Sequence, residues 1–334
     1  MTSLVWTGLG LTLLAGMASG NCMLPMKFAR RWQWENLWLV FTLVSLVAVP
    51  WCLALLLVNQ LWSVYCTAGM AALTLPLLFG FGWGIAQILF GLSIARLGLA
   101  LGYAVIIGLG SLGGTLVPLM FHHRSVIFSA KGALIFAGLV AMIAGIAISA
   151  CAGSLREKDH NKARGGSYAA ALILAVVCGL LAPMINYAFA FGQPVADRAI
   201  ALGSTPVNAA YAVWPVALAG GLLPNLFYSF YLLGKNGTWG RFRETPLRDG
   251  SLALAMGLLW MGSIAIYGVA SVYLGALGTS VGWGMFQIFM IITANSGGLL
   301  AGEWREAPRA ARVQLYSGLG MLIVATLLLS AANR

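Results

Sequence analysis

Ten long apolar runs divide this sequence, and they constrain its fold more than any other feature. Each run can cross a bilayer as a helix, because an apolar layer roughly 30 Å thick takes about 20 helical residues. All formally charged residues, 19 basic and 8 acidic, and all 3 histidines lie outside these runs. The sequence therefore predicts an all-α integral membrane protein with spans near 4–24, 36–58, 71–94, 97–121, 132–152, 168–191, 207–233, 251–274, 277–300 and 313–332.

The composition excludes several classes of protein. Apolar residues make up 60% of the chain and charged residues 8%, whereas soluble domains carry about 25% charged residues. So few charges cannot cover a water-exposed surface, which excludes soluble enzymes and disordered scaffolds. The net charge of +11 does not indicate a nucleic-acid partner, because the basic residues are spread over short loops and form no continuous face. The predicted surroundings are membrane lipid.

The distribution of basic residues predicts the orientation in the membrane. Fifteen of the 19 Lys and Arg residues fall in one alternate set of loops, and such loops are retained in the cytoplasm. An even number of spans then places both termini outside. The first span has no basic residue before it and is followed by Lys27, Arg30 and Arg31, which is typical of a retained helix and not of a cleaved signal peptide.

A weak internal repeat relates the two halves of the chain. Residues 97–103 read LGLALGY and are echoed by LGTSVGW at residues 277–283; Gly82 and Gly262 keep the same offset. Residues 111–116 resemble residues 295–300 at a slightly longer offset. The repeat pairs the fourth span with the ninth, and because five is odd, the halves must be inverted, as in secondary transporters. The prediction is two inverted five-helix repeats, 1–152 and 168–334, joined by a cytoplasmic linker at 153–167.

Several short motifs resemble those of a known family. They are PMK at 25–27, RWQWENLW at 31–38, LFG at 78–80, WG at 83–84, GLS at 91–93 and RLG at 96–98. With this spacing the chain resembles the L-rhamnose/proton symporter family of the drug/metabolite transporter superfamily, most strongly from residue 25 to about residue 118. The resemblance implies ten helices in two inverted repeats, a bacterial inner membrane, and import of a deoxysugar or related small solute with a proton. In that membrane, the outside termini expected from the basic residues are periplasmic.

The start of the ninth span departs from the family pattern. The ninth helix in the family begins with an acidic residue, whereas this chain has Thr279, Ser280 and Val281 there. Moreover, no Asp or Glu falls within any predicted span, although proton-coupled carriers normally keep an ionisable group in their pathway. The sequence leaves open whether transport is coupled to a proton or is facilitated diffusion.

A neutral sugar is bound by amide side chains, which offer both donors and acceptors, and by aromatic faces. Trp83 and Gln87 are four residues apart and share a helix face, and Trp283 and Gln287 repeat that spacing. Helix–helix hydrogen bonds or an interfacial aromatic belt are the alternative roles for such residues. Asn208, Asn225 and Asn295 are further intramembrane amides. The predicted sugar-binding residues are Asn21, Trp83, Gln87, Tyr103, Asn186, Tyr187, Tyr211, Trp214, Tyr267, Trp283 and Gln287.

Ionisable residues near the span ends receive simpler interpretations. Glu35 and Glu303 are expected to pair with Arg30, Arg31 or Arg305 at the cytoplasmic interface. Asp197 is a candidate for substrate entry or coupling, and His122 and His123 are expected to be solvated. The five cysteines show no close pairing, so no disulfide, metal or cofactor is predicted.

Other functions remain possible from the sequence. The same superfamily provides exporters and exchangers of amino acids, drugs and nucleotide sugars, but charged substrates would need a buried charge, which the predicted spans lack. A membrane-embedded enzyme would need acids, bases or metal ligands gathered at one depth, and a channel would need rings of selectivity residues. Import of a neutral sugar is the favoured interpretation, an enzyme is not predicted, and the oligomeric state is undetermined.

Overall fold

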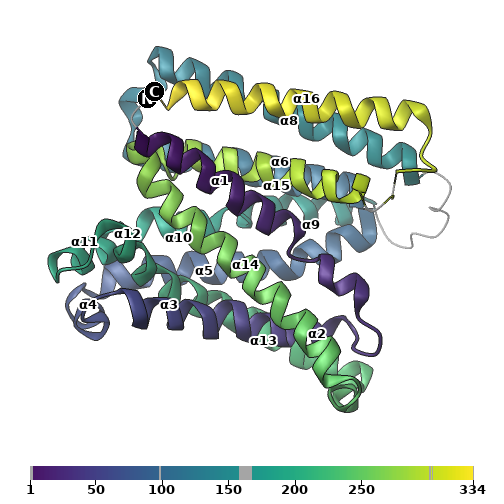
Figure 1. The fold of residues 1–334 in the computed structure, drawn as a ribbon, viewed down its shortest axis with the longest axis horizontal. Coiled ribbons are helices and arrows are strands. Elements are labelled where there is room, and N and C mark those ends of the chain that lie inside the picture. Colours follow the sequence, from purple (N-terminus) through teal and green to yellow (C-terminus); the bar gives the residue numbers. More distant parts are fainter. Residues whose placement is uncertain (1–2, 98, 158–167, 301, 303, 334) are drawn as a thin grey trace.

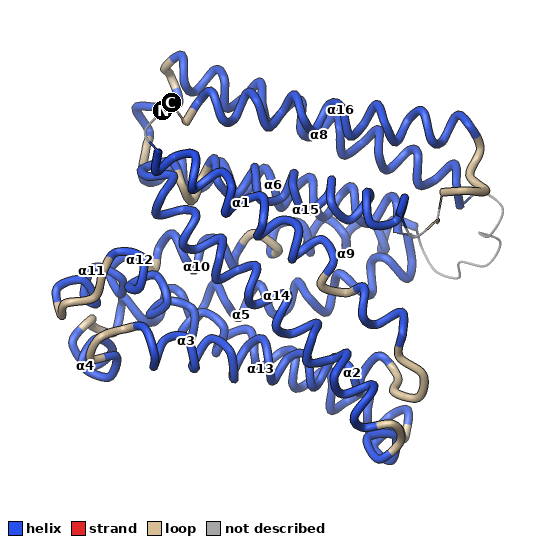
Figure 2. Tube along the Cα trace, viewed as in Figure 1, coloured by secondary structure: helices blue, strands red, loops and turns tan. Residues whose placement is uncertain are grey.

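A computed structural model describes residues 3–97, 99–157, 168–300, 302 and 304–333, and among them it contains helices and no strand. Ten helical segments are long and apolar enough to cross a membrane, which confirms the predicted number of spans. Figure 1 shows most of them running along the long axis of the molecule, with the eighth span crossing obliquely, and Figure 2 shows most loops gathered at the two ends.

The first half of the chain supplies five spans. They are formed by α1 (Ser3–Asn21) with η1 (Leu24–Phe28), by α2 (Trp34–Thr42), η2 (Leu43–Ala48) and α3 (Val49–Leu57), by α5 (Met70–Leu97), by α6 (Leu99–His122) and by α8 (Ala130–Glu157). In the second span, η2 is a stretch of π-helix directly before Pro50. Pro50 has no amide hydrogen to continue the α-helical ladder, which explains the irregular turn.

The second half supplies the other five spans. They are formed by α9 (Tyr168–Leu181) and α10 (Met184–Phe191), by α13 (Val213–Asn236), by α14 (Pro246–Leu274), by α15 (Val281–Leu300) and by α16 (Arg309–Ala332). The sixth span is interrupted at Ala182 and Pro183, because Pro183 has no amide hydrogen to continue the helical ladder. The linker predicted at 153–167 begins inside α8, and residues 158–167 lie outside the described residues.

Short helices cover the two ends. One end carries α4 (Leu61–Thr67), α7 (Arg124–Ile127), α11 (Gln193–Ala201), α12 (Pro206–Ala209), η3 (Ala210–Ala212) and η5 (Gly275–Leu277), together with the start of α1 and the end of α16 (Figure 1). We call it the α11 end. The opposite end carries η1 and η4 (Thr238–Arg243), and we call it the Lys27 end after a residue of η1.

Several charged residues lie inside the spans, so the prediction that all of them fall outside is wrong at the helix ends. The second span begins at Trp34 and includes Glu35, and the eighth begins at Pro246 and includes Asp249. Lys131 and Arg156 likewise lie within the fifth span. The physical reason is that these helices continue past the apolar layer by one or two turns, where a polar side chain finds backbone partners or water.

The helices form layers whose contacts relate the two halves. In Figure 1, α8 and α16 lie together on one side, α1, α6, α14 and α15 lie in the middle, and α5 and α13 lie on the other side. The α5–α13 approach depends on glycine, because a Cβ atom on Gly80 would collide with the carbonyl oxygen of Ala217 and one on Gly220 with that of Leu77.

The choice of helix neighbours follows the predicted repeat. Helix α1 packs against α15, as α9 packs against α6, and α14 packs against α2, as α5 packs against α13. The pairs α8–α16 and α6–α15 each join equivalent helices of the two halves. If each helix is replaced by its equivalent in the other half, the same set of helix contacts results. A duplicated fold requires this correspondence. The inversion of the repeats itself stays a prediction.

Candidate functional site

A cavity of about 640 Å³ lies between the two halves. Its wall combines residues of α1, α5, α6, α8, α9, α14 and α15. One part of its lining consists of the buried side chains of Trp83, Trp260 and Trp283. Another part consists of the exposed side chains of Leu24 and Lys27. Along α15 it extends from Trp283 to Gly298, roughly 22 Å at 1.5 Å per residue. The cavity therefore begins deep in the bundle and opens at the Lys27 end.

The structure brings together part of the predicted sugar-binding set. Six of the predicted residues line the cavity: Asn21, Trp83, Gln87, Tyr103, Trp283 and Gln287. The five that do not line it are Asn186, Tyr187, Tyr211, Trp214 and Tyr267. Asn295, one of the further amides, also lines the cavity. Binding of sugar by any of these residues stays a prediction.

Two glutamines present unused amide groups to the cavity. Gln87 is half-buried on α5, and Gln287 on α15 is 6% exposed. No hydrogen bond joins either side chain to another residue in the described part of the chain, and neither amide is among its fully enclosed, unpartnered polar groups. A buried amide without a partner is costly, so both groups are available to a polar solute.

Indole rings form the deep wall of the cavity. Trp83 stacks on Trp260 with ring centroids 5.1 Å apart and an interplanar angle of 20°. Trp283 lies across from them on α15 and donates its Nε1–H to the carbonyl oxygen of Gly110 at 3.2 Å. Gly114 makes room for this indole, since a Cβ atom there would collide with Trp283 Nε1. Stacked apolar faces next to free amides suit the C–H and hydroxyl surfaces of a sugar.

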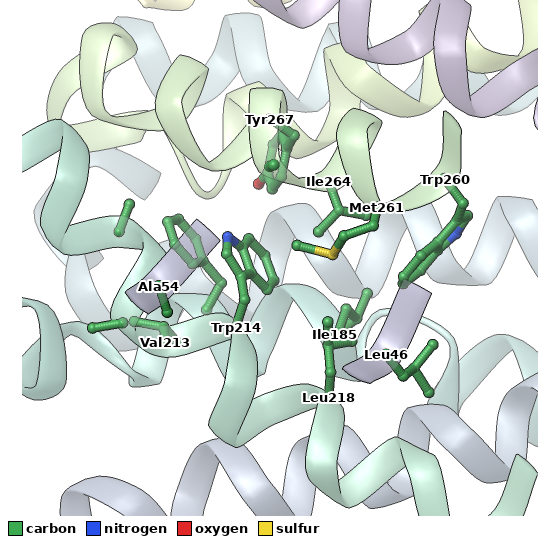
Figure 3. Close-up of a cluster of buried hydrophobic side chains, with 14 of the residues drawn as sticks. Leu46, Ala54, Ile185, Val213, Trp214, Leu218, Trp260, Met261, Ile264 and Tyr267 are labelled. Carbon is green, nitrogen blue, oxygen red and sulfur yellow. The ribbon is translucent and has the colours of Figure 1, made fainter. Parts of the chain in front are cut away.

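Trp260 is a wall residue that the sequence pattern does not single out. Figure 3 shows it at one edge of the buried cluster that also contains Met261 and Ile264. Its local sequence is apolar on both sides and contains no neighbouring amide. No local signal separates such a tryptophan from one that faces lipid, because helix rotation alone decides between the two.

A hydrogen-bonded seal closes the bundle beyond the deep wall. Asn186 on α10 donates its Nδ2 hydrogens to the carbonyl oxygens of Gly114 at 2.9 Å and Thr279 at 2.8 Å. The hydroxyl of Tyr267 on α14 donates to Asn186 Oδ1 at 2.6 Å. We call Asn186, Tyr267 and Trp283, with the carbonyl groups that they contact, the α11-end seal. Two predicted pocket residues, Asn186 and Tyr267, therefore join helices in this structure.

The remaining predicted aromatics pack around that seal. Trp214 stacks on Phe189 with centroids 4.7 Å apart and rings 5° from parallel, and Figure 3 shows Trp214 close to Tyr267 in the buried cluster. The Tyr187 ring contacts Phe79 edge-on at 5.7 Å. Tyr211 is half-buried against the same core.

The mouth of the cavity is polar and cationic. Lys27 is exposed there, and the Arg156 guanidinium lies 4.7 Å from the centre of the Trp304 ring, a cation–π distance. Asn21 donates its Nδ2–H to the Met17 carbonyl oxygen on its own helix at 2.9 Å. Neither carboxylate nor histidine is among the described residues that line the cavity.

The carboxylates make different contacts from those expected. Glu35 accepts hydrogen bonds from Asn236 Nδ2 at 3.0 Å and Thr238 Oγ1 at 2.7 Å, so the expected pairing with Arg30 or Arg31 is wrong. Its partners are neutral because the loop before α14 folds over the start of α2. Asp197 accepts from Gln193 on its own helix. Glu303 lies outside the described residues.

The histidines and cysteines form no centre among the described residues. The His122 side chain is exposed and packs its ring 5.0 Å from that of Phe191, while His123 is half-buried. All five cysteines are free thiols. The described residues contain no group of three or more His, Cys, Asp or Glu side chains that could hold a metal ion.

Ten spans that enclose a cavity with no carboxylate on its described lining, reachable from one end, define a multi-pass membrane transport protein. Residues 1–332 match the profile of the family described as L-rhamnose-proton symport protein (RhaT), and the chain belongs to this family.

Curated relatives agree with that assignment. The chain is 29% identical over 322 residues to the L-rhamnose-proton symporter of Escherichia coli strain ATCC 8739, covering 93% of this chain and 94% of that protein. Proteins of the same name from Escherichia coli O1:K1 / APEC and strain SMS-3-5 are 28% identical over 322 residues, with the same coverage.

Proposed function

We propose that this protein imports L-rhamnose or a related deoxysugar together with a proton, by alternating access, across a bacterial inner membrane. Family membership and the function for which the relatives are named support the substrate and the coupling ion. The observation that carries the proposal is the cavity between the two halves, which has two unpartnered glutamine amides and a stacked indole wall and no carboxylate on its described surface.

The binding arrangement follows from these groups. The amides of Gln87 and Gln287 lie on different helices and each offers one acceptor and two donor hydrogens to sugar hydroxyls. The Trp83–Trp260 stack covers the less polar face of the ring and the methyl group that distinguishes a deoxysugar. Tyr103 and Trp283 complete the aromatic wall.

The orientation assigns a conformation to the structure. With the Lys27 end in the cytoplasm and both termini in the periplasm, the cavity is open inward and the α11-end seal closes the periplasmic side. Release of sugar into the cytoplasm would occur from this state. Return to the periplasm requires the seal to open and the Lys27 end to close.

Counterflow of radiolabelled L-rhamnose in proteoliposomes tests the proposal. Vesicles loaded with unlabelled L-rhamnose should accumulate label transiently, and an inward proton gradient should raise uptake into empty vesicles. An ionophore that collapses the gradient should abolish this stimulation. Counterflow that survives with no response to the gradient would show facilitated diffusion instead, and absence of counterflow would refute the sugar substrate.

The double variant Gln87→Ala/Gln287→Ala tests the binding arrangement. Loss of two amides that each contribute about 1 kcal/mol should raise the L-rhamnose concentration at half-maximal counterflow by roughly thirtyfold. Gln193→Ala, which removes an amide bonded to Asp197 outside the cavity, is the matched control and should not change it. An unchanged half-maximal concentration in the double variant would remove both glutamines from the site.

A further inference from the structure

Besides the amide of Asn186, the α11-end seal contains two donor side chains of the second half, Tyr267 and Trp283. The Tyr267 hydroxyl donates to Asn186 Oδ1 at 2.6 Å, and the Trp283 Nε1–H donates to the Gly110 carbonyl oxygen at 3.2 Å. Each donor joins helices that must separate if the cavity is to open at this end. The two bonds therefore stabilise the state in which the α11 end is closed.

Both donors have counterparts in the first half of the chain, at the offset of the internal repeat that aligns residues 97–103 with residues 277–283. Tyr267 corresponds to Gln87 and Trp283 corresponds to Tyr103. Gln87 and Tyr103 both line the cavity that opens at the Lys27 end. Neither side chain makes a hydrogen bond within the described part of the chain. The donors of one half are thus engaged, while the equivalent donors of the other half are idle at an open mouth.

The acceptors show the same relation. Asn186 donates to the carbonyl oxygen of Gly114 in the pair Gly113–Gly114 of α6. The repeat aligns this pair with Gly297–Gly298 of α15, and Asn21 lies against Gly297, because a Cβ atom there would be 2.8 Å from Asn21 Oδ1. Asn21 donates to Met17 on its own helix and lines the cavity, and its Oδ1 receives no hydrogen bond from any described residue.

We propose that Gln87, Tyr103 and Asn21 form a second seal, which closes the Lys27 end when the α11-end seal opens. In that state Gln87 Nε2 donates to Asn21 Oδ1, as Tyr267 now donates to Asn186. Tyr103 donates to the carbonyl oxygen of Met290, which corresponds to Gly110 at the offset of the repeat. The amide of Gln87 keeps its Oε1 and a second hydrogen for the sugar, so it can bind solute and close the mouth together.

This inference rests on the proposed alternating access, and it predicts that the two seals compete. One set of helices cannot satisfy both, because closing each end opens the other. Weakening the α11-end seal must therefore raise the population in which Asn21 and Gln87 meet. A structural role for these residues in the open state alone would give no such dependence.

Disulfide crosslinking across the mouth tests the proposal. In full-length protein with the five native cysteines replaced by Ala or Ser, the pair Asn21→Cys/Gln87→Cys is oxidised with copper phenanthroline in lipid nanodiscs. The matched control is Asn295→Cys/Gln87→Cys, because Asn295 also lines the cavity and its Nδ2 is also bonded to its own helix, at Ile291. The first pair should crosslink, and the control pair should crosslink at least tenfold more slowly.

Adding Tyr267→Phe to the first pair supplies the decisive readout. Loss of the bond to Asn186 should raise the crosslinking rate about threefold, the effect of one interhelical hydrogen bond in a membrane protein. The proposal is overturned if the first pair crosslinks no faster than the control. It is also overturned if Tyr267→Phe leaves the rate unchanged or lowers it.

A second measurement covers failure of the double-cysteine protein to fold. Ala150→Cys places a single thiol on the cavity wall of α8. Because Asn21→Ala weakens the second seal, it should raise the rate at which a membrane-impermeant maleimide labels this thiol. An unchanged labelling rate overturns the proposal. L-rhamnose counterflow is measured on the cysteine-free parent. If the crosslinking pattern appears without counterflow, the sugar assignment fails and the paired seals stand; if counterflow appears without the pattern, the paired seals fail and the sugar assignment stands.

Discussion

The two ends of the bundle are held by loop contacts of similar placement and different chemistry. At the Lys27 end, the contacts are made by two buried carboxylates. Asp249 in the first turn of α14 binds the loop after η1, and Glu35 on α2 binds the end of α13 and the loop before α14. At the α11 end, the loop before α4 is fastened to the loop after α11 mainly by neutral groups. We call these contact sets the Lys27-end clasp and the α11-end clasp.

Asp249 is the centre of the Lys27-end clasp. It is fully buried and accepts hydrogen bonds from the backbone N–H groups of Arg30 at 3.2 Å, Arg31 at 2.9 Å and Trp32 at 3.0 Å. Thr245 Oγ1 adds a fourth donor at 3.0 Å. Charge-assisted bonds of this kind are about twice as strong as neutral ones, so one side chain fixes the path from η1 to α2.

Most bonds of the α11-end clasp are neutral, and one exposed bond joins Arg198 Nε on α11 to Thr67 Oγ1 on α4 at 2.7 Å. Ser204 Oγ accepts from the Asn59 backbone N–H at 2.9 Å, and Asn59 Nδ2 donates to the Gly203 carbonyl oxygen at 2.7 Å. Tyr65 adds a bond from its hydroxyl to the Ala212 carbonyl oxygen at 3.0 Å. The comparison indicates that equivalent loops are joined at both ends, more strongly at the Lys27 end.

The largest expected effect is that of Asp249→Ala. The substitution leaves three backbone N–H groups without their acceptor, that of Trp32 buried and those of Arg30 and Arg31 part-buried, so it should reduce the free energy of unfolding by about 3 kcal/mol. Thermal denaturation in detergent, followed by intrinsic tryptophan fluorescence, measures the change. Asp197→Ala removes a carboxylate bonded only within α11 and is the control; equal losses in the two variants would refute the central role of Asp249.

Glu35→Ala is expected to be less damaging. It removes one carboxylate that accepts from two side chains, Asn236 and Thr238, and the exposed Asn236 can turn toward water after the change. The expected loss of stability is about 2 kcal/mol in the same denaturation assay. Glu35→Gln keeps an acceptor oxygen and should recover part of this loss. A loss larger than that of Asp249→Ala would reverse the ranking of contacts within the clasp.

Ser204→Ala is expected to have the smallest effect. It removes one neutral hydrogen bond to the Asn59 backbone, which corresponds to about 1 kcal/mol. The denaturation midpoint should fall by less than in either carboxylate variant. If Ser204→Ala destabilised the protein as much as Asp249→Ala, the two clasps would be equal in strength and the proposed difference between the ends would be wrong.

Several local features of the structure could be predicted from sequence patterns. The ten spans follow from the length of the apolar runs, and the interruption of the sixth span follows from Pro183, which lacks an amide hydrogen. The helix-face argument placed Trp83 with Gln87 and Trp283 with Gln287, and all four line one cavity. These features depend on near neighbours in the chain, so sequence spacing is sufficient to predict them.

Features that depend on contacts between distant helices could not be predicted from the sequence. Asn186 and Asn21 have similar sequence surroundings, yet one bonds across helices and the other lines the cavity mouth. The sequence pattern predicts no role for Asp249, whose side chain binds the loop after η1, in the other half of the chain. The local sequence contains no information on the register between helices, and that register decides these roles.

The sequence by itself determined that this chain resides in lipid as ten helices, because apolar run length and charge placement set the free energy of insertion of each span. The tertiary structure decided which amides and indoles share a cavity, which end of it is open, and that Trp260 completes its wall. Those outcomes depend on the rotation and crossing of helices. In lipid these are set by close packing and polar contacts between helices that are distant in the chain.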